Sequence, residues 1–196
     1  MTALPRISRP VLLATALVMG LAAATAGKAS AGQFEGLVLV PQAKTETLAP
    51  QFKRGQVVSF QTRQKPGSIV IVTRENALYY ILGNGKAVKY RVATAKRGFE
   101  WKGSNQVSAK VKWPDWRPPA QMRKRRPELP AYMAGGPENP LGARAIYLGS
   151  SIYRIHGTNE PSSIGKAASS GCIRMLNADV AELFQHVKLG ATVTVV

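Results

Sequence analysis

The chain has 196 residues, enough for one domain with a sizeable core, and its 45% hydrophobic composition argues against global disorder. Its 27 Lys and Arg against 10 Asp and Glu give a formal net charge of +17, which indicates an anionic partner such as nucleic acid, anionic lipid or a carboxylate-rich polymer. One Cys and two His exclude an internal disulfide framework and a multi-Cys zinc site, so we predict neither a metal nor another cofactor.

The first 31 residues have the features of an export signal. Arg6 and Arg9 precede an apolar run at residues 11–26, and Ala-Ser-Ala at residues 29–31 fits a signal-peptidase cleavage site. The apolar run is shorter than the ~20 residues that a membrane-spanning helix needs. We therefore predict a signal peptide at residues 1–31 and an exported chain in the periplasm or cell envelope, without stable membrane insertion. A retained membrane anchor is the alternative.

The predicted export changes the meaning of the positive charge. Nucleic acid is a poor partner outside the cytoplasm, whereas a bacterial envelope is rich in peptide carboxylates and anionic polymers. The basic run at residues 123–126 lies between proline-containing segments at 113–119 and 127–130, so we interpret it as a solvated loop and not as a nucleic-acid patch. The charge therefore favours an anionic component of the envelope as the partner.

In chain order, residues 32–66 contain only short apolar stretches and are predicted to be an extension that packs on the main domain. The β-branched residues at 69–73 then predict a strand. Residues 78–82 and 87–92 predict a β-hairpin, because the Gly-Asn-Gly turn at 83–85 separates them.

Residues 98–143 contain most of the prolines and are predicted to form a long loop that acts as a lid or as a wall of a binding site. Two short strands are predicted at 145–148 and 152–155. A helix is predicted at 177–187, with its first residue, an Asn, as the N-cap, and a last strand is predicted at 192–196. The expected fold is therefore mostly β with one helix.

Two side chains in the last quarter of the sequence predict nucleophilic catalysis. His156 ends a predicted strand, and Cys172 lies in a Ser- and Gly-rich turn and not in the apolar run that a buried structural Cys prefers. Near pH 7 an imidazole can accept the thiol proton, and a neighbouring imidazolium lowers the pKa of a thiol. Gly171 permits a tight backbone whose N–H groups face a substrate oxygen. An inert Cys and a structural His are the alternative.

An ordered motif surrounds both residues. It consists of Tyr-Arg-Ile-His-Gly-Thr at residues 153–158 and Ser-Ser-Gly-Cys-Ile-Arg-Met at residues 169–175, with 16 positions from His to Cys. In this motif, and in the segments at 113–119 and 136–142, the sequence resembles the L,D-transpeptidase (YkuD-domain) family. The resemblance covers residues 67–196 and implies a β-sandwich-like L,D-transpeptidase catalytic domain.

The resemblance also implies a reaction. Cys172 attacks the carbonyl before a terminal D-Ala of a peptidoglycan stem peptide, and D-Ala leaves with a proton from His156. An amine of a second stem then converts the thioester into a cross-link. In this family the backbone carbonyl after the His orients the imidazole, which here is the carbonyl of Gly157. The N–H groups of Gly171 and Cys172 are the candidates for the oxyanion hole.

Further residues are expected to bind the substrate. Arg174 is predicted to hold a stem carboxylate, with a solvated Arg as the alternative. Ser169 and Ser170 are either turn formers or hydrogen-bond donors near the substrate, and Ser170 stands where many relatives have a second His. Tyr132 and Met133 are predicted to form a wall of the pocket.

Other functions stay open from the sequence. With water as the acyl acceptor the chain would be a peptidoglycan hydrolase of the same fold, a carboxypeptidase or an endopeptidase. With a protein amine as the acceptor it would attach envelope proteins to peptidoglycan. A non-catalytic, basic envelope-binding protein is a further alternative, and the intact pair of His156 and Cys172 argues against it.

Overall fold

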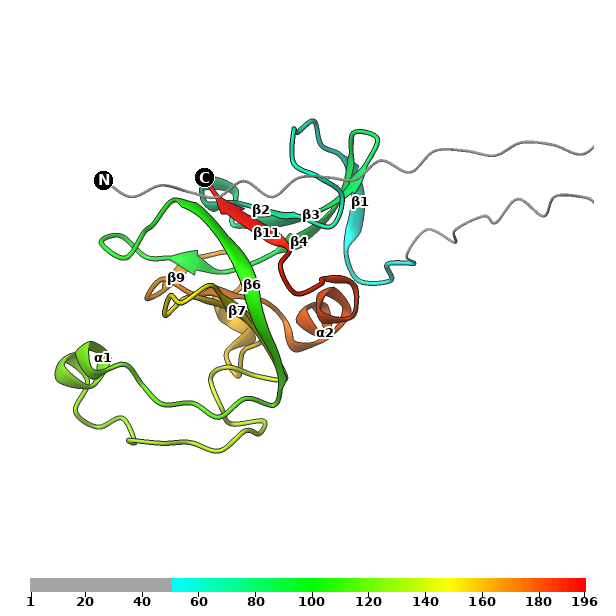
Figure 1. Ribbon diagram of the computed structural model, residues 1–196. Helices are drawn as coiled ribbons and strands as arrows, with labels where there is room; N and C mark the ends of the chain where they lie inside the picture. The colour runs from blue at the N-terminus through cyan, green and yellow to red at the C-terminus, as the bar shows by residue number, and fades with distance from the viewer. Residues whose placement is uncertain (1–50) are drawn as a thin grey trace, which may run out of the picture. The chain divides into compact units, whose positions relative to one another are not determined.

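A computed structural model of the chain describes residues 51–196 (Figure 1). The predicted signal peptide and residues 32–50 of the predicted extension lie outside this range. Nine strands form one sheet in the order β1-β4-β3-β2-β11-β6-β7-β8-β10, and β5 pairs with β9. The elements are β1 Gln56–Ser59, β2 Ile69–Val72, the 3-10 helix η1 Thr73–Glu75, β3 Ala77–Gly83, β4 Lys86–Arg91, β5 Thr94–Ala95, β6 Gly103–Lys112, α1 Ala120–Arg125, β7 Arg144–Leu148, β8 Arg154–His156, the 3-10 helix η2 Pro161–Ser163, β9 Ala167–Ser169, β10 Ile173–Arg174, α2 Asn177–His186 and β11 Thr192–Val195.

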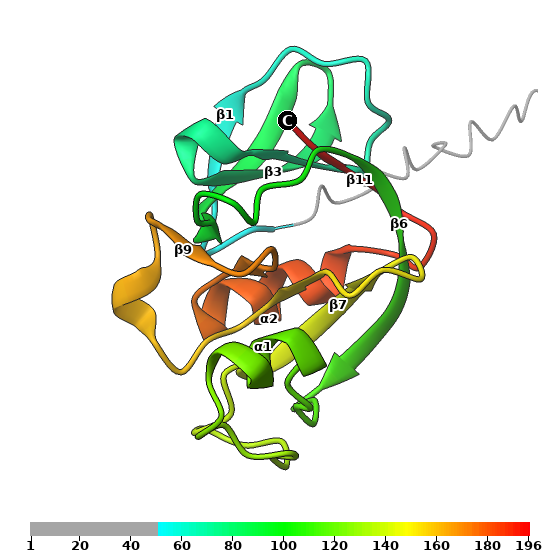
Figure 2. The same cartoon turned by 90° about the vertical axis from the view of Figure 1, so that its left-hand side faces the viewer.

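The large sheet has two halves that share strand β6. The first residues of β6 pair antiparallel with β11, and its remaining residues pair antiparallel with β7. Figure 2 shows β6 curving from β11 to β7, with α2 between the two halves. Side chains from both halves and from α2 form one buried cluster, which confirms the mostly β, sandwich-like prediction. Its largest fully buried members include Ile69, Ile71, Leu78, Ile146, Leu148, Ile155, Ile173, Met175 and Leu183.

The predicted hairpin is confirmed as β3 and β4. Asn84 and Gly85 have φ values of 51° and 68°, the left-handed pair that a two-residue hairpin turn requires. The predicted strand before the hairpin is β2, and all four of its residues are buried. Its neighbour on the other side is β11, which runs parallel to it. The four central strands of this half therefore follow from local hydrophobic patterns.

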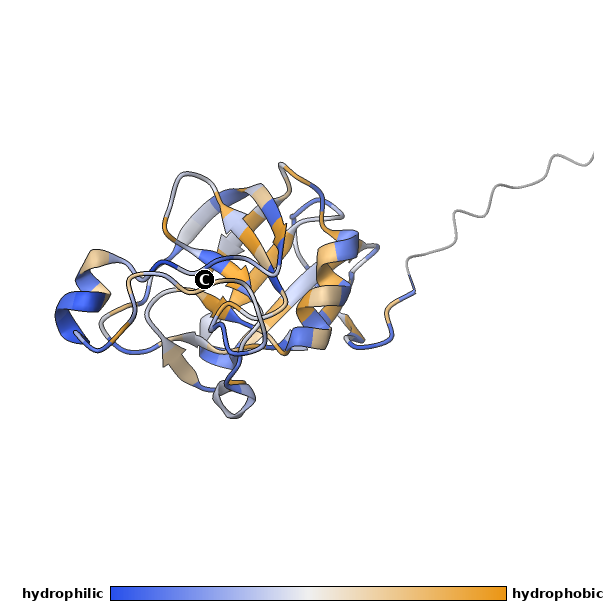
Figure 3. Ribbon diagram, turned by 90° about the horizontal axis from the view of Figure 1, so that it is seen from below, coloured by the Kyte–Doolittle hydropathy of each residue, from blue (hydrophilic) through white to orange (hydrophobic). Residues whose placement is uncertain are grey.

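The prediction of a continuous loop over residues 98–143 is wrong in two places. Residues 103–112 form β6, whose second half alternates apolar Val107, Ala109 and Val111 with polar residues, a short strand pattern that the sequence analysis missed. Residues 120–125 form the short helix α1 with no buried residue, so part of the basic run lies on a helix and not in a loop. Figure 3 shows the hydrophobic residues gathered in the central strands and a largely hydrophilic α1 at the left.

Helix α2 is confirmed almost at its predicted length, and Val180 and Leu183 face the core. The predicted N-cap is wrong. Leu176 holds the N-cap position, and no side chain caps the helix. The side chain of Asn177 instead bonds to two loops outside the helix, as described below.

Residues before β1 are tied to α2 by one carboxylate. Glu182 accepts hydrogen bonds from the backbone N–H groups of Lys53, Arg54 and Gly55, at 2.6–3.2 Å, and from the Tyr90 hydroxyl at 2.8 Å. Burial raises the pKa of Glu182, but these hydrogen bonds outweigh it, so the pKa lies below its ordinary value. In the part of the chain that the structure describes, neither helix is long and apolar enough to cross a bilayer.

Candidate active site

His156 ends β8 and is buried, with 4% of its surface exposed. Its Nδ1 lies 2.6 Å from the carbonyl oxygen of Gly157. A carbonyl oxygen only accepts, so Nδ1 carries the proton and Nε2 is left as the basic nitrogen. Strand β10 runs parallel to β8 and places Arg174 opposite His156. The sheet edge therefore holds the imidazole next to the segment that begins with Cys172.

The turn after His156 is held by a residue whose role the sequence analysis missed. Asn177 Oδ1 accepts hydrogen bonds from the N–H groups of Ala143 (2.9 Å) and Thr158 (3.1 Å), and its Nδ2 donates to the Thr158 carbonyl (3.0 Å). A Cβ atom at Gly157 would lie 2.1 Å from Asn177 Oδ1, so only glycine fits there. Asn177 thus fixes the carbonyl that meets the imidazole.

The turn that contains Cys172 is fixed by side chains around it. Ser169 is buried, its hydroxyl donates to the Cys172 carbonyl at 2.5 Å, and it accepts the Gly171 N–H at 3.1 Å. Trp101 Nε1 donates to the Gly171 carbonyl at 2.8 Å. Gly171 has a φ of +115° and contacts the Tyr153 ring so closely that a Cβ would lie 2.6 Å from it. Ser169 is thus a turn former, and the Gly171 N–H is already bonded to it.

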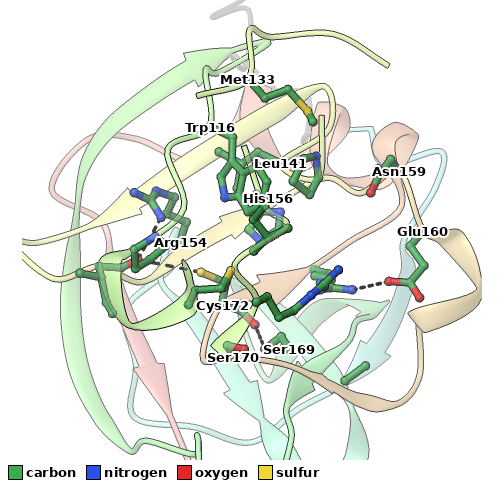
Figure 4. Close-up of a pocket in the computed structure, with 18 of the residues that line it drawn as sticks. Trp116, Met133, Leu141, Arg154, His156, Asn159, Glu160, Ser169, Ser170 and Cys172 are labelled. Atoms are coloured by element: carbon green, nitrogen blue, oxygen red, sulfur yellow. Dashed lines mark hydrogen bonds and ion pairs between the residues drawn. The ribbon is translucent and has the colours of Figure 1, made fainter. Parts of the chain in front are cut away.

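The thiol of Cys172 faces a carbonyl that it shares with an arginine. The sulfur donates weakly to the Ile152 carbonyl at 3.9 Å, and Arg154 Nη1 donates to the same oxygen at 3.1 Å (Figure 4). Arg154 and His156 are two positions apart on β8, so their side chains lie on the same face of the strand. Arg154 Nε is buried without a hydrogen-bond partner among residues 51–196, and the guanidinium stacks on Tyr147 at 4.9 Å.

Burial favours the neutral form of both reactive groups. The pKa of His156 is lowered to about 4, chiefly by burial and to a smaller extent by the charges of Arg174 and Arg154, against the hydrogen bond to Gly157, which raises it. Burial also raises the pKa of the Cys172 thiol, and the N–H groups and charge of Arg154 offset only part of this effect. A resting imidazolium beside a thiolate, as the sequence analysis expected, is therefore not supported. The resting pair is a neutral thiol and a neutral imidazole.

Cys172 and His156 line one cavity of about 640 Å³. Ser169, Ser170 and Arg174 also line it, and Arg174 Nη1 forms an ion pair with Glu160 at 2.8 Å. The other lining residues are Lys96, Trp116, Pro119, Met122, Arg125, Arg126, Leu129, Pro130, Met133, Glu138, Pro140, Leu141, Ile152, Tyr153, Arg154, Asn159, Glu160 and Ala168.

The long segment between β6 and β7 forms one wall of this cavity. Trp116 and Met133 join its two arms by a pair of backbone hydrogen bonds, each of 2.8 Å. Buried Asn139 donates to the carbonyls of Pro114 and Ala134, at 3.1 and 2.9 Å. Met133 lines the cavity as predicted, whereas Tyr132 does not. Its ring lies under the guanidinium of Arg117 on the outer side of the wall, with 43% of the residue exposed.

Comparisons with known proteins agree with the motif. Residues 66–195 match the YkuD family, the L,D-transpeptidase catalytic domain. ErfK/SrfK of Escherichia coli (strain K12), named a probable L,D-transpeptidase, is 34% identical over 166 residues, which are 81% of this chain and 51% of that protein. A Fuscovulum blasticum protein from the ATP synthase subunits region, named as an L,D-transpeptidase, is 32% identical over 191 residues, which are 89% of this chain and 96% of that protein.

The fold is also found among solved structures. A crystal structure of an Enterococcus faecium L,D-transpeptidase aligns with a TM-score of 0.55 at 15% identity, over 68% of this chain and 50% of that chain. The chain spans about half the length of the ErfK/SrfK proteins that it matches. The shared part is the domain that contains the cavity.

Proposed function

The chain belongs to the YkuD family of L,D-transpeptidase catalytic domains, and on that premise we propose that it cross-links peptidoglycan with Cys172 as the nucleophile. The observation that supports this most is the meeting of Cys172 and His156 in one cavity that is large enough for a peptide. Basic residues outnumber acidic ones among the lining side chains, which suits a stem peptide with several carboxylates. An exported protein would meet such peptides in the envelope.

The first half of the reaction forms a thioester. Nε2 of His156 accepts the thiol proton as the sulfur of Cys172 attacks the carbonyl carbon of the bond before D-Ala. The C–S bond forms and the C–N bond breaks, and the D-Ala amine leaves with the proton that the imidazole received. The Cys172 N–H is the oxyanion donor that this site supports best, because the Gly171 N–H must first release Ser169.

The second half exchanges the thioester for a new amide. An amine of a second stem attacks the acyl carbon, gives its proton to His156, and expels the sulfur, which regains that proton. One amide replaces another, so neither an oxidant nor water is consumed. Gly157 keeps Nε2 of the imidazole available throughout, because its carbonyl binds the proton on Nδ1.

Arg154 is proposed to compensate the negative charge on the sulfur. The thiol and the guanidinium share the Ile152 carbonyl, so the cation is already beside the sulfur when the proton leaves. A neutral imidazole gives no such stabilisation before proton transfer. Arg154 thereby stabilises the thiolate, a role for which the sequence suggested an imidazolium.

Product analysis tests the proposal. The purified protein is incubated with disaccharide-tetrapeptides, and products are identified by mass spectrometry beside a Cys172→Ala control. Dimers joining a tetrapeptide to a tripeptide, formed with release of D-Ala, are the expected result. Free tripeptide without dimers identifies a hydrolase. A tripeptide attached to an amine of a protein identifies a protein-attaching enzyme. Unchanged substrate overturns the proposal.

A further inference from the structure

A second basic feature lines the cavity at a distance from the motif residues. The Lys96 ammonium lies 5.2 Å from the centroid of the Phe99 ring, and the Arg125 guanidinium carbon lies 4.9 Å from the same centroid. Lys96 follows β5, whereas Arg125 ends α1, so the ring joins two distant segments of the chain. Aromatic faces attract cations, but two cations on one ring repel each other. An anion between them would relieve that repulsion.

Among residues 51–196 no acid forms an ion pair with either cation, Lys96 or Arg125. The acid nearest in sequence, Glu100, turns its carboxylate to the backbone N–H of Gly98 at 2.6 Å.

The other cations of the cavity are already engaged. Arg174 pairs with Glu160 at 2.8 Å, and Arg126 pairs with Glu128 at 2.7 Å. Arg154 lies at the sulfur, as described above. Lys96 and Arg125 are thus the cavity-lining cations that have neither an acidic partner among residues 51–196 nor a position at the sulfur.

The backbone of Lys96 is hydrogen-bonded to the segment that carries the nucleophile. Its backbone N–H donates to the Ser169 carbonyl at 3.0 Å, and Ser169 in turn bonds to the Cys172 carbonyl. Farther along the same segment, Trp101 bonds to the Gly171 carbonyl. The backbone from which the Lys96 side chain projects is therefore anchored to the segment that carries the reacting sulfur.

We propose that Lys96 and Arg125 form a carboxylate-binding subsite, which takes a carboxylate of the peptide substrate other than the one assigned to Arg174. The inference rests on the proposed function, since that function makes a stem peptide the ligand. An ammonium and a planar guanidinium that both reach one carboxylate give charge-assisted hydrogen bonds that a carboxamide cannot match. The site should therefore prefer stems with free carboxylates over stems whose carboxylates are amidated.

Binding to the Cys172→Ala full chain tests this subsite without requiring turnover. Two synthetic tetrapeptide stems are compared by calorimetry, one with free carboxylates and one in which the carboxylates before the cleaved bond are carboxamides. We expect the free-acid peptide to bind about 5- to 10-fold more tightly, a preference that falls with added salt. Lys96→Gln and Arg125→Gln should each remove most of the preference.

Matched controls exist on the same two segments. Arg97 and Arg123 are exposed cations that do not line the cavity, so Arg97→Gln and Arg123→Gln should leave the preference intact. Equal affinity for both peptides, no binding of either, or a preference that persists in the Lys96→Gln/Arg125→Gln double variant would overturn the subsite. Release of D-Ala by the wild-type protein is measured separately. A binding preference without release leaves the subsite standing and rejects the proposed function, and release without a preference does the reverse.

Discussion

The two halves of the large sheet differ in the length of their strands and in the polar groups that they bury. In the half from β1 to β11, strand β2 is buried on both faces. Residues 53–55 before β1 are anchored by the Glu182 carboxylate, which accepts hydrogen bonds from four residues. In the half from β7 to β10, the strands β8 and β10 have three and two residues, and they carry a buried imidazole and a buried guanidinium nitrogen without a partner. Both halves contribute fully buried residues to the core, and the second half in addition holds buried polar groups that lower its stability.

Cys172→Ala should have the largest effect on activity and almost none on stability. We expect the rate of D-Ala release to fall on the order of 10⁴-fold or more, because the nucleophile is lost. The melting temperature should stay close to that of the wild type, since the residue contributes little to the apolar core. Release assays and thermal unfolding on the same preparations check both parts. Release at the wild-type rate would reject Cys172 as the nucleophile.

Asn177→Ala should lower both stability and activity, because the residue joins α2 to the loops at Ala143 and Thr158 beside the site. Two part-buried N–H groups and one part-buried carbonyl lose their partner, which should cost about 2–4 kcal/mol in the free energy of unfolding. D-Ala release should fall as well, since the turn at Gly157 loosens. Urea unfolding measures the first effect. A loss below about 0.5 kcal/mol would show that water replaces the amide without cost.

The burial of His156 should make the free energy of unfolding depend on pH between 6.5 and 4. Its pKa is lowered from 6.5 to about 4 in the folded chain, so below pH 6.5 the unfolded chain binds a proton that the folded chain refuses. The free energy of unfolding should therefore fall between pH 6.5 and 4, by at most about 3 kcal/mol. His156→Gln should abolish this slope. An identical slope in both proteins would place its origin elsewhere.

Arg154 can be tested through the reactivity of the thiol. Because burial raises the pKa of the Cys172 thiol above its ordinary value, we expect alkylation by iodoacetamide to be slow at neutral pH. Arg154→Met should slow alkylation at pH 8 several-fold further, and Arg154→Lys, which keeps the charge, should slow it less. Rates measured against pH for the three proteins decide this. Superimposable curves would remove Arg154 from the proposed role.

Glu182→Gln should affect the first half alone. The variant keeps an oxygen acceptor but loses the charge, so we expect about 1 kcal/mol less stability and unchanged D-Ala release. The lowered pKa of Glu182 means that its contribution is present above pH 4.5 and is lost as the pH falls through the lower folded value. The variant should therefore lose less stability on acidification below pH 4.5 than the wild type does. Equal losses would contradict the proposed anchoring of residues 53–55 by the Glu182 carboxylate.

Local patterns explain what was predictable from the sequence. The hairpin at 77–91 and helix α2 carry their own turn signal or apolar face, so both were found. Strand β6 was missed because its ladder partners, β11 and β7, lie far along the chain and its own residues are mostly polar. Only its second half, residues 107–112, alternates apolar and polar side chains, and six residues inside a polar, Pro-rich stretch are a weak signal.

The same distinction applies to the site. Cys172 and His156 were found because an ordered motif surrounds them. Arg154 belongs to that motif, but its position at the sulfur depends on the Ile152 carbonyl and on the fold of the strand end. Asn177 was taken for a helix cap because its partners, at Ala143 and Thr158, are 34 and 19 positions away. Type and spacing reveal the reacting groups, whereas the groups that position them depend on tertiary structure.

The central place of β11 has a consequence for the order in which the chain can fold. Val193 pairs with Ile69 on one side and with Asn105 on the other, so the ladder between the two halves forms only once this segment, which follows Cys172 in the chain, is in place. Pairing across so long a stretch of chain is slow, and Cys172 is exposed to oxidants until it happens. Because Cys172 is the single Cys among the 196 residues, the waiting thiol has no second thiol in the sequence with which to form a wrong disulfide.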